Sequence, residues 1–313
     1  MIAGAILSSL ILLSIASYTY FTTTFIRFFY QEFSLLVHPS YISMYINMCL
    51  AWLLLKIINK EFKEAGYSNS IAVIIITFLS FINVLLSSKI GLLTMIFVFI
   101  GFLIYYIIKK RKYLFGMIGM LTIAAVIFSA LRLLPEMAGR VNRSIAAFSH
   151  PSTNPSDTES TAVRFFIWKA ANQVIAENFL LGVGTGDAKD ALMLEYEKRG
   201  MTGAIEHKLN SHNEFYQVFV SLGLIGFIFL ILSLFLPLFF AYKTNNVIYI
   251  LFLIIIIFNF FPESMLETQA GVVFYAFFNS ILCFNSSNNQ QPTTNNQQST
   301  TNNQNDPIFT TTY

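Results

Sequence analysis

The chain has 313 residues, of which 55% are hydrophobic and 11% are charged, and its formal net charge is +3 at pH 7. Soluble domains carry roughly 25% charged residues, so the composition excludes an ordinary soluble protein and indicates an integral membrane protein. The Lys and Arg residues are spread between apolar segments, which argues against nucleic-acid binding. Both cysteines, Cys49 and Cys283, lie inside apolar segments and predict neither a disulfide nor a metal framework.

Apolar stretches near the ~20 residues needed to cross a bilayer recur along the chain. We therefore predict an all-α fold, a polytopic helical membrane bundle of about eight transmembrane helices. Five helices fall in residues 1–134 and three in residues 214–284. In chain order, the predicted helices cover residues 2–20, 41–58, 70–86, 90–108, 113–134, 215–241, 247–261 and 271–284, with the last beginning as early as Leu266 if it spans fully.

The segments between these helices differ in character. Residues 21–40 combine Arg27, Glu32 and His38 with aromatic side chains and predict an interfacial loop that Pro39 keeps from being helical throughout. Residues 87–89 are too few for anything but a tight turn. At the other extreme, residues 285–313 form an Asn/Gln/Thr-rich tail without a core-forming pattern, which we expect to be disordered in the cytoplasm.

A basic run at residues 109–112 sets the predicted orientation, because short cytoplasmic loops hold the excess of Lys and Arg. Counting from this run places residues 59–69 and Lys243 inside as well. The 87–89 turn and the long 135–213 segment then fall outside, as one large external loop containing amphipathic helices. Lys89 and His212 are thus expected on the same external face.

The external segment is predicted to begin with Pro135 and to include a flexible loop at Ser149–Thr161. Apolar residues at helical spacing then predict an amphipathic helix over residues 161–178, capped by Thr158 or Ser160. Arg164 lies in its first turn, where a cation opposes the helix dipole. Its charge therefore serves a partner, or else the side chain reaches into lipid headgroups.

Two further features complete this segment. Gly182–Gly186 resembles a phosphate loop superficially, but no strand precedes it and no Lys-Ser/Thr pair ends it, so a simple turn is favoured over backbone contact with a phosphate. Alternating charges over residues 187–198 predict a solvated helix that ends at Gly200. His207 and Lys208 are expected to face solvent.

His212 lies at the boundary where the hydrophilic segment ends and an apolar helix starts. An imidazole there can exchange a proton near neutral pH, although the position alone favours an interfacial His without chemistry. Glu263 and Glu267 follow the seventh predicted helix, and carboxylates beside a membrane segment are costly unless they are partnered or wet. They are candidates to pair with Arg164 or Lys89, with plain surface solvation as the alternative.

Several of these stretches together resemble the O-antigen ligase family, membrane glycosyltransferases that also include O-antigen polymerase-like and protein O-oligosaccharyltransferase relatives. The resemblance covers roughly residues 80–284. Its blocks are Ser88-Lys89-Ile90-Gly91, Arg164-Phe165-Phe166-Ile167-Trp168, Leu181-Gly182-Val183-Gly184-Thr185-Gly186, Ser211-His212-Asn213-Glu214-Phe215, Gly223-Leu224-Ile225-Gly226 and Glu263-Ser264-Met265-Leu266-Glu267. The family usually has Arg where this chain has Lys89, which keeps the charge but loses the planar geometry of guanidinium.

The resemblance implies transfer of a glycan from an undecaprenyl-pyrophosphate carrier to a hydroxyl of a lipid-A-core, glycan or protein acceptor. The reaction would occur at the periplasmic face of the bacterial inner membrane, without a metal or nucleotide cofactor. By the same resemblance, Arg164 and Lys89 would stabilise the pyrophosphate leaving group, and His212 would act as general base on the acceptor. Support is expected from four polar residues, Asn213, Glu214, Glu263 and Glu267.

Three other functions remain open at the level of the sequence. A polysaccharide polymerase would use a second lipid-linked glycan as acceptor. A lipid or polysaccharide transporter would also attract anionic lipids to an external basic vestibule, but the predicted spans contain almost no charge, whereas transporters often place ionisable residues near the bilayer midplane. An inactive structural subunit is the third alternative.

Overall fold

The computed structural model describes residues 1–23, 28–66, 68–111, 113–133, 135–149 and 161–288. Within these ranges every regular element is a helix, which confirms the predicted all-α class. The helices are α1 (Ile2–Thr22), α2 (Pro39–Ile58), α3 (Glu61–Glu64), α4 (Asn69–Leu86), α5 (Lys89–Lys110), α6 (Tyr113–Leu133), α7 (Pro135–Ser149), α8 (Ala162–Glu177), α9 (Ala188–Lys198), α10 (Thr202–Glu206), α11 (Glu214–Lys243), α12 (Val247–Phe260), the 3₁₀ helix η1 (Met265–Glu267) and α13 (Gln269–Asn288).

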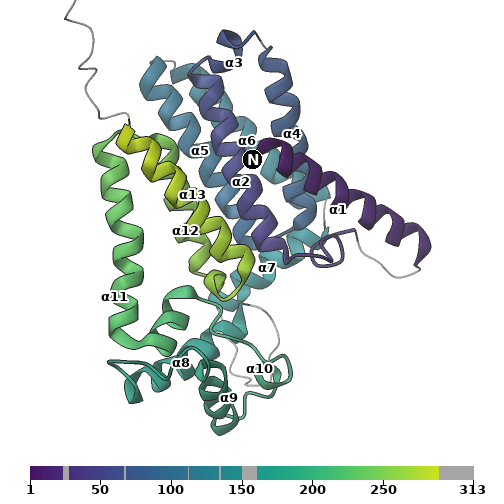
Figure 1. Ribbon diagram of the computed structural model, residues 1–313. Helices are drawn as coiled ribbons and strands as arrows, with labels where there is room; N and C mark the ends of the chain where they lie inside the picture. The colour runs from purple at the N-terminus through teal and green to yellow at the C-terminus, as the bar shows by residue number, and fades with distance from the viewer. Residues whose placement is uncertain (24–27, 67, 112, 134, 150–160, 289–313) are drawn as a thin grey trace, which may run out of the picture.

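Helix α2 forms the centre of the bundle, packed against α4, α5 and α12 (Figure 1). Most of its side chains are buried, as expected for a helix that is apolar on all sides. It begins at Pro39, two residues before the predicted start. Pro39 occupies the first turn, where its missing N–H costs nothing, and the His38 side chain caps the helix by accepting from the Ser40 N–H.

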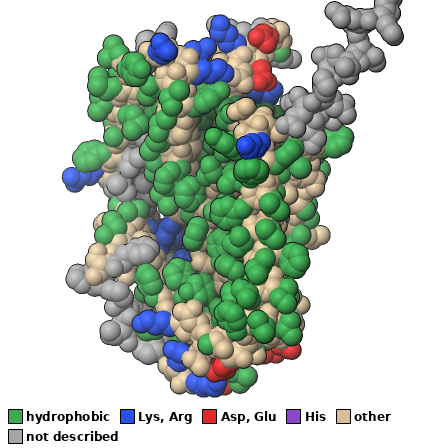
Figure 2. All heavy atoms as spheres, turned by 90° about the vertical axis from the view of Figure 1, so that its left-hand side faces the viewer, with side chains coloured by type: hydrophobic (Ala, Val, Ile, Leu, Met, Phe, Trp, Pro, Cys, Tyr) green, Lys and Arg blue, Asp and Glu red, His purple; other side chains and the backbone are tan. Residues whose placement is uncertain are grey.

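Five helices are long and apolar enough to cross a membrane: α1, α2, α4, α5 and α11. Helices α12 and α13 are apolar but shorter. Figure 2 shows hydrophobic side chains covering most of the middle of the face on which α11 lies, with most of the visible Lys and Arg toward its two ends. The chain is therefore a membrane protein, while the predicted total of eight spanning helices stays a prediction.

The two ends of the bundle carry different connections. At one end Lys109 Nζ donates to Asn59 Oδ1 at 2.9 Å, which joins the end of α5 to the 59–69 connector. At the opposite end, where Figure 1 shows α8, α9 and α10, Lys89 Nζ donates to Thr161 Oγ1 at 2.9 Å. The predicted inside and outside connections thus lie at opposite ends of the bundle.

Helices α8, α9 and α10 form a second, smaller hydrophobic core, with Ile167, Leu192 and Tyr196 fully buried. The prediction of a solvated helix over residues 187–198 is therefore wrong for one face of α9. Even Glu195 is buried there, and its carboxylate pairs with Arg199 at 2.6 Å and with Lys198 at 3.3 Å. His207 and Lys208 are exposed, as predicted.

Some predictions fall on residues outside the described ranges. These are the flexible loop at Ser149–Thr161 except for its two ends, the caps Thr158 and Ser160, and the tail from residue 289 onward. The start of the predicted tail is described: α13 continues to Asn288, so residues 285–288 are helical. The predicted extension of this helix to Leu266 is wrong, because Met265–Glu267 form a separate 3₁₀ turn.

Helix α11 was predicted as one uninterrupted helix, but it breaks at Gly223, whose φ of 62° and ψ of −160° are not helical. The break leaves the carbonyls of Val220 and Ser221 without helical partners. The glycine-rich loop supplies them, because Val183 and Gly184 donate their N–H groups to these two carbonyls at 2.9 Å each. The loop and the membrane helix are thus locked together at the end of the bundle that carries α8.

Candidate active site

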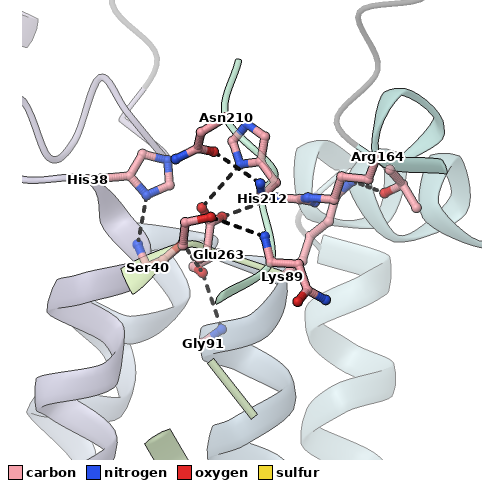
Figure 3. Close-up of polar contacts among 12 residues, drawn as sticks. His38, Ser40, Lys89, Gly91, Arg164, Asn210, His212 and Glu263 are labelled. Atoms are coloured by element: carbon pink, nitrogen blue, oxygen red, sulfur yellow. Dashed lines mark hydrogen bonds and ion pairs between the residues drawn. The ribbon is translucent and has the colours of Figure 1, made fainter. Parts of the chain in front are cut away.

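Glu263 lies at the centre of a polar group at this end of the bundle, in the turn between α12 and η1 (Figure 3). Its Oε1 accepts a hydrogen bond from the Arg164 guanidinium at 3.1 Å, and its Oε2 lies 3.4 Å from His212 Nδ1. The structure therefore brings together three candidates that are far apart in the sequence. The alternative in which Arg164 reaches into headgroups does not fit, since only 15% of its side chain is exposed.

The backbone of His212 is held in an unusual conformation. Its φ of 44° lies in the left-handed region, which is uncommon for residues other than glycine and clusters at functional sites. Asn210 stabilises the turn by accepting the His212 N–H on its side-chain oxygen at 3.0 Å. On the preceding residue, the Ser211 carbonyl accepts from the Trp168 indole at 3.1 Å.

Arg164 and Trp168 are four residues apart on α8 and therefore lie on the same face of that helix. Arg164 extends to Glu263 while Trp168 holds Ser211 and stacks on Tyr216 with the ring planes 3° apart. The spacing of the Arg-to-Trp block thus places two contacts on one helix face. Arg164 reaches Glu263, and Trp168 fixes the segment that carries His212.

Lys89 is the first residue of α5, whose N-terminus is capped by Ser88 through the Gly91 N–H at 3.2 Å. Lys89, Arg164 and Glu263 line one small cleft, which we call the phosphate cleft after the role that the sequence predicts for Lys89 and Arg164. The structure therefore brings both predicted phosphate ligands to the same opening.

The other predicted support residues tie chain segments together around this cleft. Asn213 caps α11 by accepting the Tyr216 N–H at 3.1 Å. The fully buried Glu214 accepts the Leu266 N–H at 2.7 Å, which fixes η1. Glu267 hydrogen-bonds Asn210 and Gln217 rather than taking the predicted partners Arg164 or Lys89.

Sequence reasoning missed two residues of the site, His38 and Arg140. Arg140 of α7 lines the phosphate cleft, and its guanidinium carbon lies 3.7 Å from the centre of the Tyr30 ring, a close cation–π contact. His38 Nε2 lies 3.4 Å from the Tyr30 hydroxyl. The only available signal was a His and aromatic side chains in a loop at the correct end of the bundle.

The environment of His38 favours its neutral form. Burial lowers its pKa, and although Glu263 acts in the opposite direction, the charges of His212, Arg164 and Arg140 lower the pKa further. Because Nδ1 accepts the Ser40 N–H at 3.4 Å, the neutral ring carries its proton on Nε2 and donates to the Tyr30 hydroxyl.

Glu263 is held in its charged form. Burial by itself raises the pKa of this carboxyl, but the hydrogen bond from His212 and the positive charge of Arg164 more than offset burial, so the net pKa is lowered. A charged Glu263 accepts a hydrogen bond from Nδ1 of His212 when that nitrogen carries the proton. The Nε2 of a neutral His212 is then left with a lone pair, which is the form that a general base requires.

The glycine-rich loop is a turn, as favoured from the sequence. Gly182 donates its N–H to Asn178 at 2.9 Å, and the N–H groups of the next two residues are used by α11. These three donors are not available to a phosphate. Among the described residues, no group of three His, Cys, Asp or Glu side chains is arranged to hold a metal ion.

Comparison with known proteins bears on what this geometry is for. The family model described as O-antigen ligase matches residues 72–231, which is half of the chain and includes Lys89, Arg164 and His212. The chain belongs to the O-antigen ligase family. It is also 28% identical over 135 residues to an uncharacterized protein of Haemophilus influenzae, a match covering 40% of this chain and 33% of that relative. The chain thus matches about a third of the relative's length. In this chain the candidate site consists of Glu263 in contact with Arg164 and His212, with Lys89 on the same cleft.

Proposed function

We propose that this chain transfers a glycan from an undecaprenyl-pyrophosphate carrier to an acceptor hydroxyl. Membership of the O-antigen ligase family implies a membrane glycosyltransferase acting on glycan or lipid-linked substrates. The observation that carries the finer proposal is Glu263 bridging Arg164 and His212, with Lys89 on the same cleft. This arrangement puts cations for a leaving group next to an oriented base for a nucleophile.

In the proposed reaction the acceptor oxygen attacks the anomeric carbon of the donor sugar. The bond from that carbon to the phosphate oxygen breaks, and the pyrophosphate leaves with the electron pair. Arg164 and Lys89 stabilise the growing negative charge. This stabilisation accelerates the reaction more in a poorly hydrated site than it would in water. His212 takes the hydroxyl proton, and Glu263 stabilises the imidazolium that results.

Glu263 also controls how Arg164 is used. In the absence of substrate its carboxylate neutralises the guanidinium at 3.1 Å. Arg has five N–H donors in a planar fork, so it can keep one bond to Glu263 and still present others to a pyrophosphate. The same carboxylate thereby fixes the positions of the leaving-group ligand and of the base.

A polysaccharide polymerase or a protein O-oligosaccharyltransferase would use the same donor and the same residues with a different acceptor. The transporter alternative is less well supported, because Lys89, His212 and Glu263 lie at the ends of membrane helices and not near their middles. We further propose that the protein resides in the bacterial inner membrane with the site facing the periplasm. The basic run at residues 109–112 supports this orientation.

The direct test uses the purified full chain in lipid nanodiscs with an undecaprenyl-pyrophosphate-linked glycan. Lipid-A-core, glycan and peptide acceptors are supplied separately. Transfer to one of them, lost in Arg164→Ala, is expected; a chain that binds lipid pyrophosphate but transfers to none of them contradicts the proposal. For orientation, a single cysteine at Lys189 should react with an impermeant reagent added to intact spheroplasts, whereas one at Lys60 should not. Both residues are exposed in the structure.

A further inference from the structure

A second cleft adjoins the phosphate cleft. Its polar lining comes from Tyr30, Gln31, Glu32, Ser87, Arg140 and Arg143. Tyr30 and Arg140 line both clefts, so the two openings are separated by a shared wall made of these two side chains. Neither Gln31, Glu32 nor Arg143 has a part in the mechanism described above.

The shared wall is firmly held. Tyr30 adopts a left-handed φ of 60°, and its N–H donates to the Leu85 carbonyl at the end of α4 at 3.1 Å. The Arg140 guanidinium packs on the Tyr30 ring at 3.7 Å, and the Tyr30 hydroxyl contacts His38. Arg143 lies three residues after Arg140 on α7, so the two side chains project from neighbouring positions on one face.

The lining of the second cleft is chemically mixed. Arg140 and Arg143 are donors, the Glu32 carboxylate is an acceptor, and Gln31 can do both. A purely anionic ligand would be repelled by the Glu32 carboxylate. A purely apolar ligand would displace water from these polar groups without replacing its hydrogen bonds. A neutral ring rich in hydroxyl groups, each able to donate and accept, matches both kinds of partner.

We propose that the second cleft is the subsite for the sugar ring bonded directly to the donor pyrophosphate. This inference rests on the proposed function of the phosphate cleft. Only one oxygen atom separates the anomeric carbon of such a donor from phosphorus, so its sugar must occupy space that adjoins the phosphate. The second cleft adjoins it across Arg140, which contacts the phosphate side, whereas Gln31 and Arg143 bind the hydroxyl groups of a neutral sugar.

The test measures binding of two short-chain polyprenyl pyrophosphates, one bare and one carrying a single neutral hexose, to the purified full chain in nanodiscs. The wild-type chain should bind the hexose-bearing lipid more tightly than the bare one. Arg143→Ala and Gln31→Ala should each lose about tenfold in affinity for the hexose-bearing lipid and leave the affinity for the bare lipid unchanged. Arg140→Ala should weaken binding of both.

Lys189→Ala is the matched control, since it removes an exposed cation from α9, outside both clefts. Equal losses for both lipids in Arg143→Ala would make the second cleft a phosphate site and overturn the assignment. Unchanged affinities of Arg143→Ala for both lipids would also overturn the assignment. The same holds if this variant changes only the KM for a free glycan acceptor. A wild-type chain that binds the bare pyrophosphate but gains nothing from the hexose overturns this inference alone. A wild-type chain that binds lipid pyrophosphate no better than lipid monophosphate overturns the proposed function.

Discussion

His212 Nδ1 lies 3.4 Å from Glu263 Oε2, although 51 residues separate the two in the chain. The contact determines which imidazole nitrogen carries the proton, because a charged carboxylate accepts only from N–H. It also leaves His212 partly accessible, with 26% of its side chain exposed. An oriented, accessible imidazole beside a half-buried anion is the arrangement expected of a general base.

Glu263→Gln keeps the shape of the side chain but removes its charge. The imidazolium formed during transfer then has no counter-charge, so kcat should fall by about 10²-fold. The KM for the donor should change much less, because Arg164 is released to the pyrophosphate. Steady-state kinetics with purified variants separate the two effects. Glu267→Gln is the control, because the Glu267 carboxylate contacts Asn210 and Gln217 and not the imidazole. An equal loss of kcat in this control would contradict the role of Glu263 in stabilising the imidazolium.

His212→Asn tests the base without disturbing the backbone, because Asn tolerates the left-handed conformation that residue 212 adopts at φ 44°. The transfer rate should fall by roughly 10²–10⁴-fold, while donor affinity is retained. In the wild-type chain the rate should also fall toward acid pH, since an imidazolium cannot accept a proton, and this limb should vanish in the variant. Weakened donor binding with an unchanged acid limb would instead make His212 a phosphate ligand or a structural residue. The base would then be sought among Glu214, Glu263 and Glu267.

The Arg164–Glu263 pair separates stability from catalysis. Arg164→Ala leaves the Glu263 charge buried without the guanidinium and should cost about 1–3 kcal/mol of stability, as well as abolishing transfer. The double variant Arg164→Ala/Glu263→Gln should recover most of the stability but none of the activity. Arg164→Lys should recover part of the activity, because ammonium keeps the charge without the fork. Thermal unfolding and transfer rates measured on the same samples decide this; activity in the double variant would contradict the role of Arg164.

Gly182 and Gly223 should not tolerate a side chain. Both have positive φ, and a Cβ on either would lie 2.5 Å from backbone atoms of the other segment. Gly223→Ala should therefore cost about 1–3 kcal/mol from backbone strain alone and separate the loop from α11. Gly186→Ala is the matched control, because it has open space around its Cβ position and should be neutral. Equal melting temperatures for the two variants in detergent would contradict the proposed lock.

His38 predicts a pH dependence of stability. Its pKa is lowered in the folded chain, mainly by burial, so the unfolded chain binds more protons between the folded pKa and the unfolded value of about 6.5. Stability should therefore decrease as pH falls through this window and rise with pH until the unfolded value is passed. His38→Asn keeps a side-chain acceptor for the cap of α2 but does not titrate. The melting temperature of the wild-type chain should fall relative to this variant on acidification, and parallel curves would contradict the assignment.

The sequence by itself determined the class of protein and most helix ends. Apolar segments of membrane-spanning length and turn residues such as Ser87 and Ser88 are local signals, and α4 and α5 begin and end within one or two residues of the prediction. The basic run at residues 109–112 was enough to place Lys89 and His212 at the same end of the bundle. The family blocks indicated Arg164 and His212 as candidates.

Tertiary structure decided which side chains meet. Nothing local to Glu263 distinguishes it from Glu267, yet one contacts Arg164 and His212 while the other holds Asn210 and Gln217. The break at Gly223 likewise depends on a loop about 40 residues earlier that takes over two helical carbonyls. A local pattern reports burial and helical period, whereas the partner of a polar group is set by where distant segments pack.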